Sequence, residues 1–424
     1  MGSTETPEGK IKVLQVSMWD LTGHVFNGHD LTESLNTDDR FSASMLVLYK
    51  QSSNEFVGRI CNRLGLLGLR MIKYLERLLS MQNVLSPVYW FLKRNKTVIE
   101  SNIVHLQLIH FGFFGLGMIQ KLSQKKRVIW TLHDLWAITG HCIHPKYADC
   151  DRWKTGCGKC PDLSVPFPLF FDTTKALKAR KMRIFARLDI DIVVGSAMMM
   201  DLVRQSGAFP KARIHRIPFG VRTDVFRPLV SSELRQIHGI PATDFVMMFR
   251  VDRGKFKGTV HIKQMLGILE LSNVTLIAVG ERGILDGFRD RYNVLEFDWI
   301  HDDAILSELY NLSDVFVMPS RAESFGLMAV EAMACKTTVV AFANTALLEI
   351  LSGDSGVLVA DGSSKALAKA ITELCSNPEK RREIAERGYT KVLNEYRYAM
   401  WVEQMKRLYA SNLPIEKSAV GTSL

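Results

Sequence analysis

Asp314-Val-Phe-Val-Met-Pro-Ser-Arg-Ala-Glu323-Ser-Phe-Gly-Leu-Met-Ala-Val-Glu331-Ala-Met-Ala-Cys335 combines a strand, a loop and a helix. The apolar run at its start is typical of a buried strand, and the Pro-Ser pair predicts a loop after it. We expect the helix to begin near Phe325 or Gly326. Glu331 then lies about two turns beyond the loop that holds Glu323. Ligands bind at the carboxyl ends of strands in open α/β sheets, so this loop is a candidate site.

The same alternation of short apolar runs and helical patterns extends over the whole chain, which favours parallel sheets covered on both faces. Two proline residues and a glycine between 218 and 228 separate two such series. We therefore predict two doubly wound domains, 1–222 and 223–395, followed by a segment 396–424 whose helix crosses back to the first domain before a loose tail. The expected strands are Ile11–Val16, Met45–Leu48, Ile103–Leu106, Arg127–Leu132, Ile192–Val194, Arg213–Ile217, Phe245–Phe249, Val274–Val279, Val294–Phe297, Val315–Met318, Thr337–Ala341 and Val357–Val359.

Composition restricts the class of protein but does not choose the function. The 424 residues are 47% apolar and 23% charged, as in ordinary globular proteins, and the net charge is +10. A basic balance suggests anionic partners such as phosphorylated small molecules, nucleic acid or anionic lipid. No secretory signal or membrane span is evident, and seven cysteines in such a chain indicate a reducing, cytoplasmic location.

The two glutamates suit a sugar nucleotide chemically. Glu323 in the loop can accept hydrogen bonds from sugar hydroxyls, and Glu331 can accept both ribose hydroxyls. Between them, free N–H groups at the helix start can face a diphosphate, and Gly326 allows a close approach to the backbone. The expected donor contacts in this loop are Ser324, Phe325, Gly326 and Leu327.

This segment resembles the signature, with seven residues between two glutamates, of the large retaining glycosyltransferase family of the group 1 or family 4 type. The similarity continues to Val339-Val340-Ala341 and to Glu349, and it is strongest with bacterial enzymes of exopolysaccharide assembly. The resemblance implies an α/β GT-B fold, with two Rossmann-like domains facing across a cleft. It also implies a nucleotide diphosphate sugar as donor on the second domain, a saccharide acceptor on the first, and no catalytic metal.

The family places an arginine and a lysine against the donor diphosphate, and Arg250 and Lys257 match those positions. Their charges would neutralise the diphosphate and the charge that develops when the glycosidic bond breaks. The loop between them is longer than the usual form, so Arg253 and Lys255 remain alternatives.

Two residues of the first half also correspond to family positions. Gly23 follows the first strand, where the family usually carries a pair of glycines near the donor phosphates; here His24 replaces the second one. His133 follows another strand and corresponds to the histidine beside the transferred sugar. A turn glycine and a structural histidine are the simpler alternatives.

Four cysteines cluster within the insertion 139–161. Four thiolates can complete a tetrahedral zinc site and hold a loop that has no core of its own. Free thiols or disulfides are the alternative. A similar Trp-Lys-Thr-Gly-Cys-x-x-Cys-Pro pattern occurs in a subset of exopolysaccharide glycosyltransferases. The candidate structural ligands are Cys142, Cys150, Cys157 and Cys160.

The acceptor is less clearly indicated. Residues 64–79 place leucines at helical spacing with Arg70, Lys73 and Arg77 among them, as in helices that lie on anionic membranes, but also as in a sheet-covering helix with a solvated basic face. A lipid-linked saccharide acceptor and a peripheral position at the inner face of the cell membrane fit the first interpretation. Two alternative functions are a GT-B sugar-nucleotide binder without activity and a basic nucleic-acid-binding protein. No nucleic-acid module is recognisable, so we expect no nucleic-acid partner.

Overall fold

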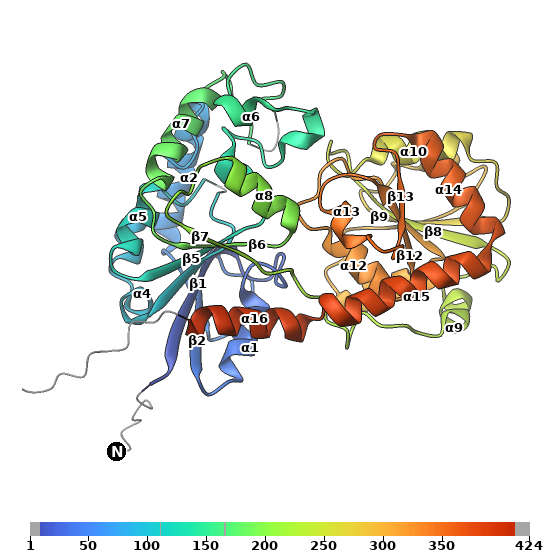
Figure 1. Cartoon of the computed structure of the whole chain (residues 1–424), viewed down its shortest axis with the longest axis horizontal. Helices are drawn as coiled ribbons and strands as arrows, with labels where there is room; N and C mark the ends of the chain where they lie inside the picture. The colour runs from blue at the N-terminus through green and yellow to red at the C-terminus, as the bar shows by residue number, and fades with distance from the viewer. Residues whose placement is uncertain (1–8, 111, 165–166, 412–424) are drawn as a thin grey trace, which may run out of the picture.

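The computed structural model describes residues 9–110, 112–164 and 167–411. Two α/β domains lie side by side and are joined by the chain near residue 220 and by the C-terminal helices (Figure 1). Both sheets are entirely parallel, which confirms the predicted fold class. The loose tail expected at the end of the segment 396–424 lies, from residue 412 on, outside the described residues.

The first sheet has seven strands in the order β3-β2-β1-β4-β5-β6-β7. Most of its strand residues are buried because helices cover both faces (Figure 1). The strands are β1 (Ile11–Trp19), β2 (Phe41–Tyr49), β3 (Val57–Arg59), β4 (Ile103–Leu106), β5 (Arg127–Leu132), β6 (Asp191–Val194) and β7 (Arg213–Arg216). The helices are α1 (His29–Asn36), α2 (Arg63–Leu78), α3 (Val88–Leu92), α4 (Lys96–Glu100), α5 (Gly117–Ser123), α6 (Arg152–Thr155), α7 (Thr174–Phe185) and α8 (Ala197–Gln205).

The second sheet has six strands in the order β10-β9-β8-β11-β12-β13. Its central strands β8 and β11 are neighbours, so the loops at their carboxyl ends lie together. The strands are β8 (Phe245–Val251), β9 (Val274–Gly280), β10 (Asn293–Phe297), β11 (Val315–Met318), β12 (Thr338–Phe342) and β13 (Val357–Val359). The helices are α9 (Ser231–Ile237), α10 (Thr259–Ile268), α11 (Asp303–Leu312), α12 (Leu327–Ala334), α13 (Leu347–Ile350), α14 (Ser364–Ser376) and α15 (Pro378–Glu395).

The last helix, α16 (Tyr398–Ala410), leaves the second domain and packs against the first (Figure 1). Val221 and Arg397 form a parallel bridge where the two connections pass each other. Tyr409 near the end of α16 is fully buried, and its hydroxyl bonds His105 of β4. The C-terminal segment therefore ties the domains together.

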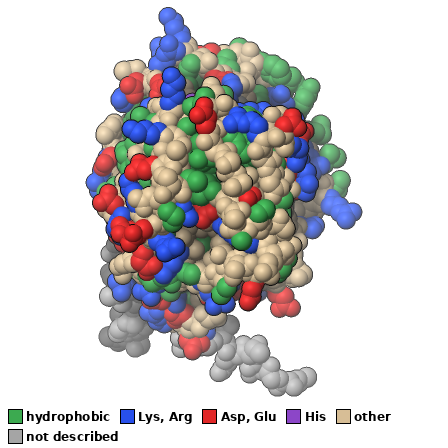
Figure 2. Space-filling model, turned by 90° about the vertical axis from the view of Figure 1, so that its right-hand side faces the viewer, with side chains coloured by type: hydrophobic (Ala, Val, Ile, Leu, Met, Phe, Trp, Pro, Cys, Tyr) green, Lys and Arg blue, Asp and Glu red, His purple; other side chains and the backbone are tan. Residues whose placement is uncertain are grey.

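Among the described residues, no helix is both long and apolar enough to cross a membrane. The end of the molecule formed by the second domain carries acidic and basic side chains intermixed (Figure 2). The basic residues Arg70, Lys73 and Arg77 of α2 belong to the first domain instead.

Candidate functional site

Lys257 and Glu323 meet where β8 and β11 end. Lys257 lies in the loop before α10, Glu323 lies in the loop before α12, and Lys257 Nζ donates to Glu323 Oε1 at 2.5 Å. Glu323 is only 8% exposed, and its backbone N–H donates to Thr345 Oγ1. A carboxylate and an ammonium at this edge can bind hydroxyls and a diphosphate, respectively.

Gly258 sets the position of Lys257. Its φ of 76° is left-handed, and an added Cβ would lie 1.9 Å from the carbonyl oxygen of Pro319. The β8 loop therefore approaches the β11 loop at backbone distance, and only glycine fits between them. Gly326, with φ 98°, caps α12 in the same way after Glu323. Both helices thus start at this edge, with their free N–H groups near the lysine–glutamate pair.

Arg250 lies at the end of β8, as the sequence places it. Its Nη2 pairs with Asp252 Oδ2 at 3.1 Å, and its guanidinium lies 4.4 Å from the ring centre of Trp299. Its Nε is buried and has no hydrogen-bond partner among the described residues. One donor of the fork therefore remains available in this conformation.

Arg253 and Lys255, the alternative bases, are directed elsewhere. Arg253 Nε pairs with Glu281 at 3.4 Å, and Lys255 Nζ pairs with Asp162 of the first domain at 2.6 Å. Since only Lys257 contacts Glu323, the geometry favours Lys257 as the lysine of this site.

Glu331 lies inside α12, and its carboxyl is 8% exposed. Burial, with Asp303 as a second cause, raises the pKa of Glu331 to about 8. Tyr310 donates its hydroxyl hydrogen to Glu331 Oε2 at 3.2 Å. The group is therefore largely protonated near neutral pH and can both donate to and accept from a pair of hydroxyls.

The side chains of the α12 entry loop are used partly for domain contact. The Phe325 ring is buried and packs edge-on against Phe219 at 5.4 Å, and Ser196 Oγ donates to the Ser324 carbonyl at 2.7 Å. The expected contacts of Ser324, Phe325 and Leu327 with a donor would thus have to come from their backbone N–H groups.

His133 lies at the carboxyl end of β5 and faces the boundary between the domains. Its ring stacks on Phe219 at 5.4 Å, and its Nε2 is 2.9 Å from Gln107 Oε1. The Gln107 amide nitrogen in turn donates to Gln15. Because Gln107 Oε1 can only accept, Nε2 of His133 is the protonated nitrogen and Nδ1 is an acceptor. Burial lowers the pKa of His133 to about 3, so the ring is neutral.

Gly23 begins the turn before α1 with φ 70°, and an added Cβ would lie 2.5 Å from the Phe26 ring. Phe26 in turn contacts His133, with 5.5 Å between ring centres. In the same loop, His24 pairs with Asp30 at 2.8 Å, and this bond raises the pKa of His24. Gly23 thus has a packing role, because it leaves room for the Phe26 ring that contacts His133. Any contact with the donor would be a second role.

The insertion 139–161 reaches the second domain. Two ion pairs carry this contact, Arg321–Asp149 at 3.0 Å and Lys146–Asp361 at 3.5 Å, and the Tyr147 and Phe256 rings lie 4.5 Å apart. Because Phe256 directly precedes Lys257, the insertion braces the loop that holds the candidate phosphate-binding lysine.

His144 of this insertion has no role in the sequence-based prediction. It is 4% exposed, and its Nε2 is buried without a partner among the described residues. Its electrostatic neighbours include Glu323 and Lys257. Burial lowers its pKa to about 4. Only the folded arrangement shows this proximity, because His144 and Glu323 lie 179 positions apart in the sequence.

The four cysteines of the insertion line one small cavity of about 20 Å³. All four are free thiols, and burial raises the pKa of Cys142 to about 12. In the described part of the chain, no three histidine, cysteine or acidic side chains form a ready metal-ligand set. The cysteines are thus gathered but not arranged as ligands.

The comparisons with known proteins identify the second domain. The family model of glycosyl transferases group 1 matches residues 230–391. These residues form a group 1 glycosyl transferase domain. The match contains both loops of the site, from Arg250 to Glu331.

Relatives of known sequence match part of this chain. The putative colanic acid biosynthesis glycosyl transferase WcaC of Escherichia coli is 24% identical over 277 residues, which is 61% of this chain. The alignment covers 64% of WcaC, so the chain spans a little under two thirds of that relative.

Solved structures show that both domains together have the GT-B arrangement. Sucrose-phosphate synthase from Thermosynechococcus elongatus superimposes with a TM-score of 0.69 at 20% identity, over 94% of this chain and 98% of the other. HepE of Anabaena in complex with UDP gives 0.64 at 19% identity, over 95% and 100%. These structural similarities establish the GT-B fold of this chain.

Proposed function

We propose that this chain is a retaining glycosyltransferase of the hexosyltransferase type. It transfers a sugar from a nucleotide diphosphate to a saccharide acceptor. The observation that carries the proposal is the Lys257–Glu323 pair at the carboxyl edge of the second sheet. His133 is connected to the same edge through Phe219, which stacks on His133 and packs against Phe325. Relatives named for colanic acid biosynthesis favour polysaccharide or glycoconjugate synthesis as the setting.

In the proposed reaction, Lys257 and Arg250 bind the diphosphate and take up the charge that develops on it. Glu323, released from Lys257, accepts hydrogen bonds from the sugar hydroxyls. The bond between the sugar carbon and the phosphate oxygen breaks, the acceptor oxygen bonds the same face, and its proton passes to the leaving phosphate. His133 orients the sugar through Nδ1 and needs no charge for this.

A test of the donor site needs no knowledge of the acceptor. We expect one of UDP, GDP or ADP to raise the melting temperature, and UDP is the first choice because HepE is described with UDP. A ligand at a hundred times its Kd adds about 2.7 kcal/mol of stability. No shift with any nucleotide in a folded sample would contradict the donor site.

Activity then distinguishes an enzyme from a sugar-nucleotide binder without activity. Glu323→Gln should lower donor turnover by about 10²- to 10³-fold, a typical effect of losing one stabilising contact in the transition state. Because Lys257 is partly exposed, water can solvate its freed ammonium and the fold should persist. Glu281→Gln, which removes the partner of Arg253 outside the site, is the matched control. Equal turnover in both variants would assign the chemistry elsewhere.

We also propose that Cys142, Cys150, Cys157 and Cys160 hold a structural zinc ion when it is supplied. Their shared cavity supports this, and a short rearrangement of the thiols would be required. Elemental analysis showing one zinc per chain is the expected result. Four titratable thiols without zinc would contradict it and leave the insertion held by its contacts alone.

We place the reaction at the cytoplasmic side of the cell membrane, with a lipid-linked saccharide as acceptor. The apolar outer face of α2 and the basic residues beside it support this placement.

A further inference from the structure

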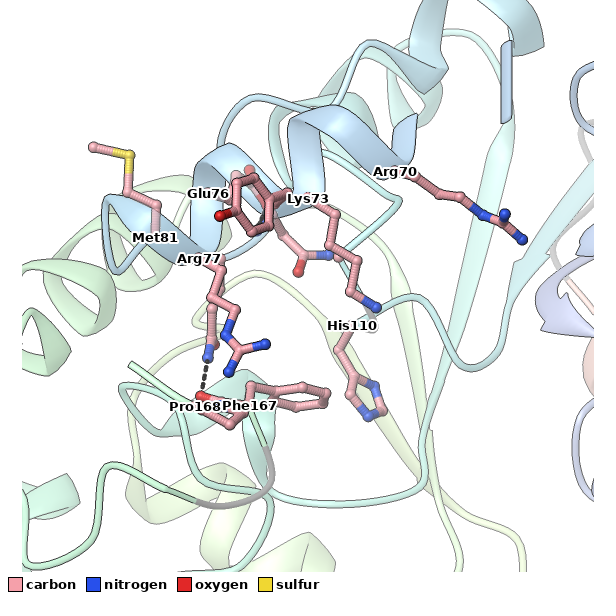
Figure 3. A pocket seen from close by; sticks show the side chains of 12 residues that line it. Arg70, Lys73, Glu76, Arg77, Met81, His110, Phe167 and Pro168 are labelled. Atoms are coloured by element: carbon pink, nitrogen blue, oxygen red, sulfur yellow. Dashed lines mark hydrogen bonds between the residues drawn. The ribbon is translucent and has the colours of Figure 1, made fainter. Parts of the chain in front are cut away.

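A cavity in the first domain lies between α2, the loop at 81–83, the residues His110 and Gly112, and the loop at 167–168. Its volume is about 370 Å³, within the range of small-molecule sites. Figure 3 shows Lys73 and Arg77 reaching from α2 over His110 and Phe167, whereas Arg70 points away from them. The Arg70 guanidinium lies over the Tyr49 ring. No carboxylate among the described residues forms an ion pair with any of the three bases.

The one acid that lines the cavity is already used by the backbone. Glu76 is 2% exposed and accepts hydrogen bonds from the N–H groups of Asn83, Val84 and Leu85 at 3.1, 2.6 and 2.6 Å. It holds the loop after α2 and does not pair with Lys73. The accessible charge of the cavity is therefore positive.

The cavity reaches toward the transfer site. His110 lines it, and His110 Nε2 lies 3.0 Å from Asp134 Oδ2. Asp134 directly follows His133 in the chain. Gly112 lies against the aliphatic stem of Lys73, with an added Cβ at 3.3 Å from the carbons of that stem.

Apolar side chains surround the bases on the outside. Along α2, about 100° per residue places Leu67, Met71 and Tyr74 nearly opposite the buried positions Leu69 and Glu76. These outward residues are 57%, 67% and 65% exposed. At the cavity mouth, the exposed Phe170 ring lies 5.7 Å from the Arg77 guanidinium.

We propose that this cavity binds the phosphate or diphosphate of an amphiphilic acceptor, whose hydrocarbon chain lies along the outer face of α2. A soluble anion would gain nothing from the exposed apolar row, and a neutral lipid nothing from Lys73 and Arg77. A phosphorylated lipid gains from both. This proposal rests on the proposed function, because the saccharide beyond the phosphate would extend past His110 to His133.

The test uses the full chain and three probes: geranyl diphosphate, geraniol and inorganic pyrophosphate. Calorimetric titration should show saturable binding of geranyl diphosphate and much weaker binding of the other two. Lys73→Gln/Arg77→Gln should weaken geranyl diphosphate about tenfold or more, since hydrogen bonds to charged groups are lost. Both residues are exposed, so the variant should fold. Lys365→Gln/Lys369→Gln makes the same change of net charge on the exposed face of α14 and should bind as the wild type does.

Three results would overturn the proposal: no saturable binding of geranyl diphosphate, equally tight binding of geraniol, or unchanged affinity in the cavity variant. The titrations are run in the presence of the nucleotide that gives the largest thermal shift, because the bound nucleotide keeps geranyl diphosphate out of the donor site. Thermal shift with that nucleotide should be the same in both variants. The absence of a thermal shift with any nucleotide would contradict the proposed function, independently of the result for the cavity.

Discussion

Glu331 and His133 are the candidate site groups in the second and first domains whose pKa values burial shifts strongly, Glu331 upward and His133 downward. The Glu331 carboxyl is buried in α12 beside Tyr310, and burial raises its pKa from the usual 4.5 to about 8. Above pH 4.5 the unfolded chain loses this proton while the folded chain keeps it. The free energy of unfolding contributed by this group therefore falls as the pH rises from 4.5 to about 8, and is constant beyond.

Glu331→Gln should remove that slope. We expect the variant to gain stability relative to the wild type between pH 5 and pH 8, by on the order of a few kcal/mol. Urea denaturation at a series of pH values measures the difference. Glu270→Gln, at an exposed position, should show a constant difference. A constant difference for Glu331→Gln would mean that the carboxyl is ionised in the fold.

At the scale of elements, the loop between β8 and α10 depends on Gly258. Its left-handed φ and the 1.9 Å distance from an added Cβ to the Pro319 carbonyl oxygen leave no room for a side chain. Gly258→Ala should separate the β8 and β11 loops, destabilise the fold by about 1 to 3 kcal/mol, and move Lys257 away from Glu323.

Gly267 in α10 provides the matched control. An added Cβ there meets nothing within 4 Å, so Gly267→Ala should be neutral or stabilising by up to about 1 kcal/mol. Thermal melts give the stabilities, and nucleotide shifts report the site. Equal behaviour of the two variants would show that the close approach of the loops is not required.

Several elements could be predicted from sequence because their apolar runs are nearly continuous. The bounds expected for the strands at 103–106, 127–132, 315–318 and 357–359 agree with those of β4, β5, β11 and β13. The edge strand β3 was missed, because only Val57 of its three residues is buried and no alternation marks it. The α12 helix begins at Leu327, one residue beyond the expected start, because Gly326 adopts a left-handed φ as its cap.

The candidate site was predictable only where a motif carries it. Glu323, Glu331 and Lys257 follow strands in recognisable patterns, but the pairing of Lys257 with Glu323 depends on the adjacency of β8 and β11. His144 and the cavity beside α2 arise from segments far apart in sequence, so no local pattern indicates them.

At the scale of the whole molecule, two connections hold the two domains in place relative to each other. The insertion 139–161 joins the first domain to the β8 loop, and α16 returns from the second domain to the first sheet. Gln15 Nε2 of β1 donates to the hydroxyl oxygen of Tyr409 in α16 at 3.0 Å. The Tyr409 hydroxyl then donates to His105 Nδ1 at 2.7 Å, and His105 Nε2 donates to Thr131. Burial lowers the pKa of His105 to about 3, so one ring nitrogen accepts and the other donates.

Tyr409→Phe should therefore leave the Gln15 amide without its acceptor in the buried core, and leave His105 Nδ1 with only the 3.3 Å contact to Gln107 Nε2. Each unsatisfied group costs about 1 to 3 kcal/mol, and the urea midpoint of the first domain should fall accordingly. Tyr389→Phe on α15 is the control, because its hydroxyl has no hydrogen bond in the described parts of the chain and its ring contact with Lys336 remains. If the two variants unfold at the same urea concentration, α16 is not anchored through this network, and the return of the chain to the first domain rests on apolar packing alone.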